Sequence, residues 1–318
     1  MLTLTEDAPP PPRPRWHPVV RSLLLLIIFF LLLVASGAGL GFVRRAAGLD
    51  PFPNAEGMLL VFALTVPPLL LVTWWFLRIF DRRGLASVGA RWPVGGRRAA
   101  LRQALTVPLI VLALFGAWLA LLALLPSTAV RSAGTSGGLT GPAGGLRLLI
   151  LLAGFLLQGG VEEWLIRGYT YHALLERWRR SVAILASSIL FALLHGANPD
   201  VSAVALINTF LAGVILALLV ERSRSLWSAV LAHGVWNFAI SSLVSLPVSG
   251  VLFPHLLSVS VQGPPLLTGD GFGPEGSVVL TLLALPLVAA LGFRLPPPAP
   301  PAGLPAPEIQ PEHSAVPS

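Results

Sequence analysis

The sequence predicts an all-α fold, a polytopic membrane helix bundle of about eight transmembrane helices with both termini in the cytoplasm. The first observation is composition: 55% of the 318 residues are hydrophobic and 11% are charged, which is too little polar surface for a soluble globule of this size. The second is that apolar runs of about 20 residues, the length that spans a bilayer, recur along the chain. The third is that the arginines gather in alternate loops.

Eight apolar runs give the predicted helices. They cover residues 22–43, 57–77, 104–125, 146–171, 182–196, 202–220, 225–246 and 277–293. The first is too long for the core of a signal peptide and further spans follow it, so we expect a retained helix. The fifth is short and ends before Asn198-Pro199, because proline disfavours helix in the preceding residue. We therefore expect the fifth helix to be buried among the others.

The charge distribution predicts the topology. All 21 basic residues are arginine, and alternating loops place 17 on the side of both termini and four, Arg44, Arg45, Arg131 and Arg147, on the other. The positive-inside rule assigns the richer side to the cytoplasm. The net charge of +7 is thereby explained by contact with the lipid bilayer, and no nucleic-acid partner is expected. The absence of cysteine excludes disulfides, thiol catalysis and Cys-based metal sites.

The domain organisation follows from the same pattern. Residues 1–21 are Pro-rich and basic and predict a disordered cytoplasmic tail, residues 22–294 form one intramembrane domain, and residues 295–318 form a second disordered Pro-rich tail. Loops 126–145 and 247–276 are rich in Gly, Pro and Ser and are expected outside. Arginine without lysine, together with abundant Ala, Leu, Gly and Pro, indicates a GC-rich bacterial genome. The predicted location is the inner (plasma) membrane of a bacterium, as a multi-pass protein.

The pair Glu162-Glu163, followed by Arg167, interrupts the fourth apolar run. A charge at the bilayer centre costs roughly 2.5–3.5 kcal/mol on insertion scales, so such a pair is a functional-site hypothesis. Glu163 and Arg167 are four residues apart and share a helix face, where the arginine can hold one carboxylate ionised. Glu162 lies about 100° around the helix and stays free, and two carboxylates in different environments are typical of acid–base sites. A salt bridge that anchors a helix end is the alternative.

Two later runs each carry a histidine. Phe191 with His195, and His233 with Asn237, are also pairs four residues apart. At about 1.5 Å per residue from the predicted cytoplasmic ends, Glu162, His195 and His233 lie roughly 14, 20 and 12 Å deep, which allows one site if the fourth helix continues to about residue 171. As alternatives, His195 could be a helix C-terminal histidine, and His233 with Asn237 could join helices by hydrogen bonds.

These residue types are the parts needed for amide hydrolysis. Glu162 would take a proton from water, His195 would orient that water or hold a metal, and His233 and Asn237 would stabilise the oxyanion. Glu162, His195 and His233 could hold a catalytic zinc, although His-x-x-x-Asn is a poorer ligand set than His-Glu-x-x-His. A metal-free mechanism fits the residues equally well, so the cofactor stays open between zinc and none.

The motifs Glu-Glu-x-x-x-Arg, Phe-x-x-x-His and His-x-x-x-Asn, in this order on successive hydrophobic helices, resemble the CAAX protease and bacteriocin-processing family of intramembrane proteases, which includes the type 2 CAAX prenyl endopeptidases. The resemblance covers about residues 146–237, within a family core at 146–246 of a protease domain at 22–294. Ile166 departs from the large aromatic residue that often precedes the arginine. The resemblance implies a helical core with a cavity open to the cytoplasm and a glutamate-dependent or metallo-endopeptidase. In it, Glu162 and His195 match the water-activating pair, and His233 and Asn237 match the oxyanion side.

The predicted function is therefore hydrolysis of a membrane-anchored protein or peptide near the cytoplasmic face, with Glu162, Glu163, Arg167, His195, His233 and Asn237 as site residues. The alternative is a catalytically silent family member that acts as a membrane scaffold or a bacteriocin-immunity factor. A transporter would be expected to show internal repeats or paired broken helices, and the sequence shows neither. No residue discriminates between leader peptides, bacteriocin precursors and anti-sigma factors as substrates.

Overall fold

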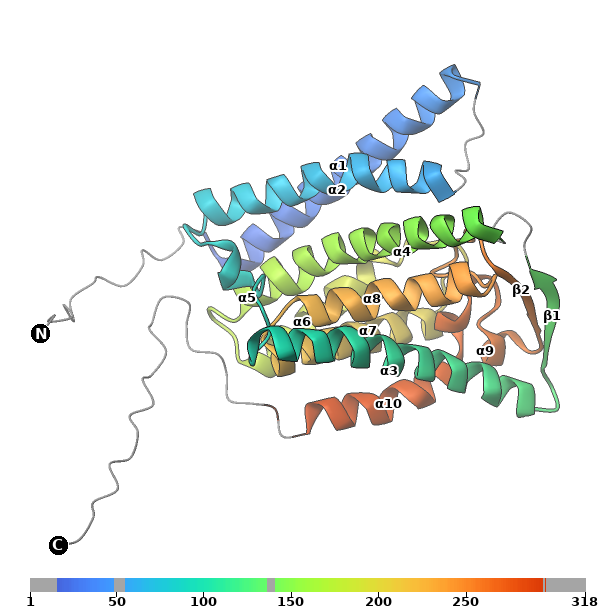
Figure 1. Cartoon of the computed structure of the whole chain (residues 1–318). Helices are drawn as coiled ribbons and strands as arrows, with labels where there is room; N and C mark the ends of the chain where they lie inside the picture. Colours follow the sequence, from blue (N-terminus) through green and yellow to red (C-terminus); the bar gives the residue numbers. More distant parts are fainter. Residues whose placement is uncertain (1–15, 49–54, 136–140, 294, 296–318) are drawn as a thin grey trace, which may run out of the picture.

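The structure is a computed structural model that describes residues 16–48, 55–135, 141–293 and 295. Its long helices lie side by side (Figure 1). The α-helices are α1 (Pro18–Ala46), α2 (Ala55–Ile79), α3 (Gly96–Leu124), α4 (Gly141–Glu163), α5 (Tyr171–Leu174), α6 (Arg180–Leu194), α7 (Ala203–Ser223), α8 (Trp227–Phe238), α9 (Pro265–Thr268) and α10 (Val278–Gly292). The described residues also form two π-helical segments, η3 (Trp164–Thr170) and η4 (Ala239–Leu243), and three 3₁₀ segments, η1 (Leu85–Val88), η5 (Asp270–Phe272) and η6 (Pro274–Gly276).

Each of the eight predicted helices has a counterpart in the structure, so the prediction of a helical membrane protein is confirmed. Within the described residues, four helical segments are long and apolar enough to cross a membrane: Pro18–Ala46, Gly96–Leu124, Ala143–Leu174 and Ala203–Ser223. Shorter apolar helices cover Leu64–Ile79, Arg180–Leu194 and Val278–Gly292. The count of eight spans and the orientation of the termini stay predictions.

The prediction of an all-α fold misses a small β-ribbon. Strands β1 (Ala129–Thr135) and β2 (Leu257–Gln262) pair antiparallel, with Ala129 opposite Gln262. They lie in the two segments predicted as irregular loops, together with α9 at one end of the bundle (Figure 1). Strand β2 alternates Ser and Val, but each strand is short and its partner lies more than 100 residues away, so no local turn signal predicts the pairing.

The opposite end of the bundle collects the arginine-rich loops. Arg21 is buried and forms ion pairs with Asp81 and with Glu176, the latter at 2.6 Å, and Arg83 also contacts Glu176 at 3.0 Å. Leu226 donates its backbone N–H to a carbonyl of the loop that precedes α3. Three loops predicted on one side of the membrane are therefore bonded together. Helix α1 starts at Pro18, inside the segment predicted as a tail, because proline is favourable in the first turn of a helix. The predicted disorder of residues 1–15 and 296–318 concerns residues outside the described part of the chain.

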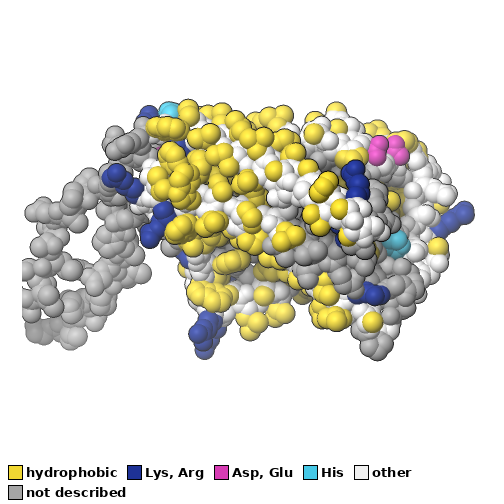
Figure 2. All heavy atoms as spheres, turned by 90° about the horizontal axis from the view of Figure 1, so that it is seen from above, with side chains coloured by type: hydrophobic (Ala, Val, Ile, Leu, Met, Phe, Trp, Pro, Cys, Tyr) yellow, Lys and Arg dark blue, Asp and Glu magenta, His cyan; other side chains and the backbone are white. Residues whose placement is uncertain are grey.

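The surface between these two ends is apolar. Hydrophobic side chains cover much of the face seen from above in Figure 2, with arginines toward its ends. Large side chains such as Leu31, Leu71 and Leu109 are each about 60% exposed. Such a surface is unfavourable in water and favourable against lipid. This agrees with a protein embedded in a bilayer.

Helix α4 continues without a break through η3 into α5, so the helix that carries the glutamates extends beyond residue 171, as the depth argument required. It packs along α8 with very little space between the backbones. A methyl group added at Gly159 would lie 3.1 Å from the His233 ring, and one at Gly234 would lie 2.9 Å from the Cα of Leu156. The two glycines allow the close approach that brings the motifs of α4 and α8 together.

Candidate active site

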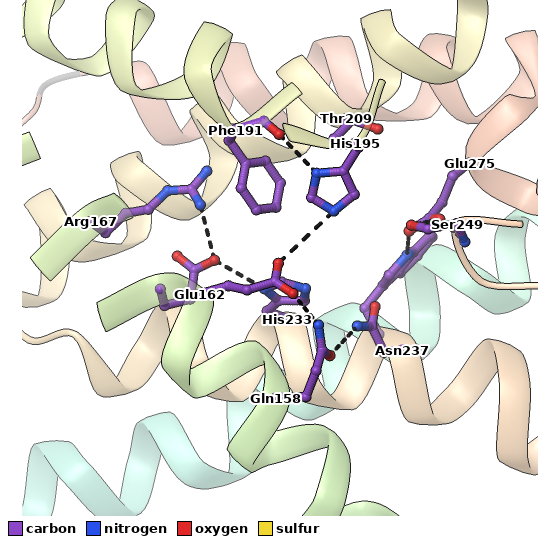
Figure 3. A network of polar contacts seen from close by, with 12 residues as sticks. Gln158, Glu162, Arg167, Phe191, His195, Thr209, His233, Asn237, Ser249 and Glu275 are labelled. Atoms are coloured by element: carbon purple, nitrogen blue, oxygen red, sulfur yellow. Dashed lines mark hydrogen bonds and ion pairs between the residues drawn. The ribbon is translucent and has the colours of Figure 1, made fainter. Parts of the chain in front are cut away.

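The structure brings all six predicted site residues into one region, where α4, η3, α6 and α8 meet (Figure 3). Glu162 and Glu163 end α4, and Arg167 lies in η3. His195 follows the last residue of α6, and His233 and Asn237 lie on α8. A π-helical segment at this point is notable because such segments are frequent at functional sites.

Glu162 faces His195 from another helix. The Oε2 atom of Glu162 lies 3.9 Å from Nε2 of His195, and the two side chains keep 25% and 16% of their surface exposed. The gap exceeds a hydrogen bond, so the two side chains face each other without a direct hydrogen bond. The other carboxylate oxygen of Glu162 accepts a hydrogen bond from the amide of Gln158. Glu162 is therefore held in place while one oxygen remains open.

The backbone fixes the orientation of His195. Its Nδ1 lies 2.8 Å from the carbonyl oxygen of Phe191, which can only accept, so Nδ1 carries the proton. The Phe191 ring lies beside the imidazole, with centroids 4.6 Å apart. The i,i+4 relation noted in the sequence thus places the other nitrogen, Nε2, toward Glu162.

Glu163 lies in a fully buried ion network behind Glu162. Its Oε1 accepts hydrogen bonds of 3.0 Å from Arg167 Nη1 and from His233 Nδ1. The Glu163 and Arg167 side chains are both 0% exposed. Arg167 also donates to the carbonyl oxygen of Gly213 at 3.0 Å and lies over the Phe191 ring at 4.2 Å. The arginine and the histidine therefore share one carboxylate, a contact between α4 and α8 that the sequence analysis did not include.

Asn237 reaches Glu162 through Gln158. Gln158 must direct its NH₂ group to the carboxylate, so its oxygen faces Asn237, which donates through Nδ2 at 3.0 Å. Gln158 is not among the site residues predicted from the sequence. Its position four residues before Glu162 is the signal that could have identified it.

A cavity of about 630 Å³ adjoins this network, a volume within the range of ligand sites. Glu162, His195, His233 and Asn237 line the cavity, whereas Glu163 and Arg167 do not. Most of the remaining lining is apolar. The predicted residues thus divide into four that line the cavity, where a substrate could touch them, and two buried behind it, Glu163 and Arg167, of which Glu163 bonds to His233.

The donor set for a metal is not assembled. Within the described ranges, no three His, Cys, Asp or Glu side chains group closely enough to hold an ion. Of the three residues that the sequence suggested as ligands, Glu162 and His195 lie 3.9 Å apart, and His233 bonds to Glu163 through Nδ1 and keeps Nε2 as its possible donor to a metal. The metalloprotease prediction is therefore not confirmed.

One acidic residue that lines the cavity, Glu275, lies outside the three motifs. Glu275, in η6, accepts a hydrogen bond of 2.9 Å from the indole nitrogen of Trp236, and Ser249 binds its other oxygen. Figure 3 shows Glu275 and Ser249 beside the network of the three motifs. Glu275 lies in a Gly/Pro-rich loop without helical periodicity, so no pattern in the sequence singled it out.

Comparison with known families supports the motif argument. Residues 144–239 match the sequence model of the type II CAAX prenyl endopeptidase Rce1-like family, and this segment contains all six predicted site residues. No curated protein matches the chain. The match implies protease activity at the general level of a CAAX-type membrane endopeptidase. The resemblance inferred from the three motifs is confirmed over residues 144–239, which are similar to the Rce1-like CAAX protease family.

Proposed function

We propose that the protein is an intramembrane endopeptidase that hydrolyses a peptide bond of a membrane-anchored protein or peptide near the cytoplasmic face of a bacterial inner membrane. The observation that carries this proposal is the facing pair of Glu162 and His195 on the wall of a largely apolar cavity. A site that excludes bulk water strengthens electrostatic catalysis.

The first step is attack by water. A water molecule between the two side chains would give one hydrogen bond to Glu162 and the other to Nε2 of His195, which is an acceptor because Nδ1 bonds to Phe191. Glu162 takes the proton as the water oxygen bonds to the scissile carbonyl carbon. The product of this step is a tetrahedral intermediate and a protonated Glu162.

The oxyanion of this intermediate requires hydrogen-bond donors. His233 bonds to Glu163 through Nδ1, so a doubly protonated imidazole keeps its Nε2–H for the oxyanion. Asn237 uses one N–H for Gln158 and has a second to donate. Each such donor typically contributes a factor of about 10²–10³ to the rate.

Collapse of the intermediate completes the reaction. The C–N bond breaks, Glu162 returns its proton to the leaving nitrogen, and the products are an amine and a carboxylic acid, which then ionises to the carboxylate. Glu163 and Arg167 take no part in bond making. Glu163 positions His233 through its hydrogen bond to Nδ1, and Arg167 pairs with the Glu163 carboxylate away from the cavity.

The test uses purified protein in detergent with a panel of quenched, membrane-anchored peptides. Wild type is expected to cleave at least one peptide, and Glu162→Ala none, while Asp270→Asn, a matched loss of an exposed carboxylate outside the cavity, cleaves like wild type. Equal cleavage by wild type and Glu162→Ala would contradict the assignment. Biological function that survives Glu162→Ala would favour the scaffold or immunity alternative.

A further inference from the structure

Glu275 holds a fixed position on the cavity wall. Its Oε1 accepts from Trp236 Nε1 at 2.9 Å, and its Oε2 accepts from the backbone N–H of Ser249 at 2.7 Å and from its hydroxyl at 2.8 Å. Three neutral donors therefore hold the carboxylate, and one acceptor position on Oε1 is left.

No cation balances this carboxylate in the part of the chain that the structure describes. The ion pairs found there do not include Glu275, and the cavity lining contains two carboxylates, Glu162 and Glu275, without an arginine. The sequence contains no lysine that could serve instead. Among the described residues Glu275 therefore has no ion-pair partner, which is unfavourable for a carboxylate partly removed from water.

Glu275 lies close to the reacting centre along a short chain of contacts. Trp236, its indole donor, precedes Asn237 on α8, and Asn237 bonds to Gln158, the partner of Glu162. An extended peptide advances 3.2–3.4 Å per residue. A substrate bound at Glu162 would therefore bring a side chain within a few residues of the scissile bond to Glu275.

We propose that Glu275 is a specificity residue that binds a basic side chain of the substrate, a lysine or an arginine near the scissile bond. The apolar stem of such a side chain suits the mostly apolar lining, and its cationic head supplies the missing counter-charge. This assignment rests on the proposed endopeptidase function and names the class of substrate that the cavity selects.

The experiment compares peptides that differ at one position, lysine or its uncharged counterpart norleucine, scanned across the residues that flank the cleavage site. At one position, wild type is expected to cleave the lysine peptide with a kcat/KM about tenfold higher, the size of one charge pair in a partly solvated cavity. Glu275→Gln should abolish that preference, whereas Asp270→Asn, which removes a carboxylate from the same loop outside the cavity, should keep it.

A second variant separates charge from structure. Trp236→Phe removes one hydrogen bond to Glu275 and leaves its charge, so the preference for lysine should persist. If Glu275→Gln slowed both peptides equally, Glu275 would be only a structural support, and the proposal would be overturned. The absence of any lysine preference in wild type would overturn it as well, even if Glu275→Gln failed to fold in a thermal melt.

Binding distinguishes failure of this proposal from failure of the proposed function. Fluorescence anisotropy with Glu162→Gln measures affinity for the same peptides without turnover. Tighter binding of the lysine peptide, lost on adding Glu275→Gln, supports the subsite even if wild type cleaves nothing, in which case only the endopeptidase assignment fails. Cleavage without any preference for lysine contradicts the subsite alone.

Discussion

Glu162 and Glu163 are adjacent in sequence and lie in two different regions of the molecule. Glu163 is 0% exposed in the wall behind the cavity and shares its Oε1 with Arg167 and His233. Glu162 is 25% exposed on the cavity side and lies 3.9 Å from His195. The rotation of about 100° between consecutive helical residues produces this difference.

In the proposed mechanism, one helix supplies both a structural carboxylate, Glu163, and a chemical one, Glu162. The charge of Glu163 is neutralised by Arg167, which makes it useful for orienting His233 and poor as a base. Glu162 has a neutral amide partner and an open oxygen, which suits proton transfer. Substitutions at Glu162 are therefore expected to change the rate, and substitutions at Glu163 to change the stability as well.

The largest effect is expected on the cavity side. Glu162→Gln keeps the shape of the side chain and removes the base, so kcat should fall about a thousandfold. Because Glu162 makes no full ion pair, the thermal midpoint should stay within about 2 °C of wild type. Parallel rate and melting measurements check both statements. A large drop in the midpoint would mean that Glu162, like Glu163, stabilises the fold.

The next largest effect is expected in the buried network of Glu163, Arg167 and His233 behind the cavity. Glu163→Gln leaves Arg167 buried without its counter-charge, which should lower the free energy of unfolding by about 3–5 kcal/mol. Denaturation in detergent measures this loss. Replacing both residues, as Glu163→Leu with Arg167→Leu, should recover much of the stability.

Activity should not return in that double variant, because His233 still lacks the acceptor for its Nδ1. Recovery of stability without activity would show that the buried ion pair stabilises the fold and that Glu163 is needed separately to position His233. Recovery of both would show that Glu163 does not position His233.

A smaller effect is expected where α7 packs against Arg167. A methyl group at Gly213 would lie 2.9 Å from the Cβ of Ser188 and 3.1 Å from Arg167 Nη2. Gly213→Ala should therefore cost about 1–3 kcal/mol by overpacking. Gly116→Ala is the matched control, since that helical position has no neighbour within 4 Å, and it should not destabilise the protein. Equal melting of the two variants would argue against the tight packing of Arg167.

Gln158→Ala should lower kcat/KM about tenfold, which corresponds to about 1.4 kcal/mol. The substitution removes the amide that positions Glu162 and accepts from Asn237, while the wall is untouched. Steady-state kinetics with an unchanged melting curve would support this role. An undiminished rate would mean that Glu162 needs no support from Gln158.

No effect is expected from a chelator, because in the proposed mechanism Glu162 and His195 activate the water without a metal. Cleavage should continue after treatment with EDTA, and adding zinc should not raise the rate. Loss of activity that zinc restores would require a different arrangement of Glu162, His195 and His233 in the working enzyme.

The sequence predicted the helices and the partners within each helix because both follow from periodicity. The apolar runs located eight helices, and the spacing of four identified Glu163 with Arg167 and His195 with Phe191. The family resemblance was carried by the same residues.

Contacts between elements were harder to predict. The bond from His233 to Glu163 depends on how closely α4 packs on α8, which glycine at position 159 permits but does not specify. Glu275 reaches the cavity through a loop whose path is set by Trp236 and Ser249, and the β1–β2 pairing joins segments distant in sequence. Neither contact leaves a periodic pattern in the sequence.

The central claim is that Glu162 and His195 activate a water molecule rather than attack the substrate directly. A single turnover in water enriched in ¹⁸O tests it, with mass spectrometry of both the product and the Glu162 peptide. The account predicts one ¹⁸O atom in the new carboxyl group and none in Glu162. Label in the Glu162 carboxylate would reveal a covalent acyl intermediate and contradict the account.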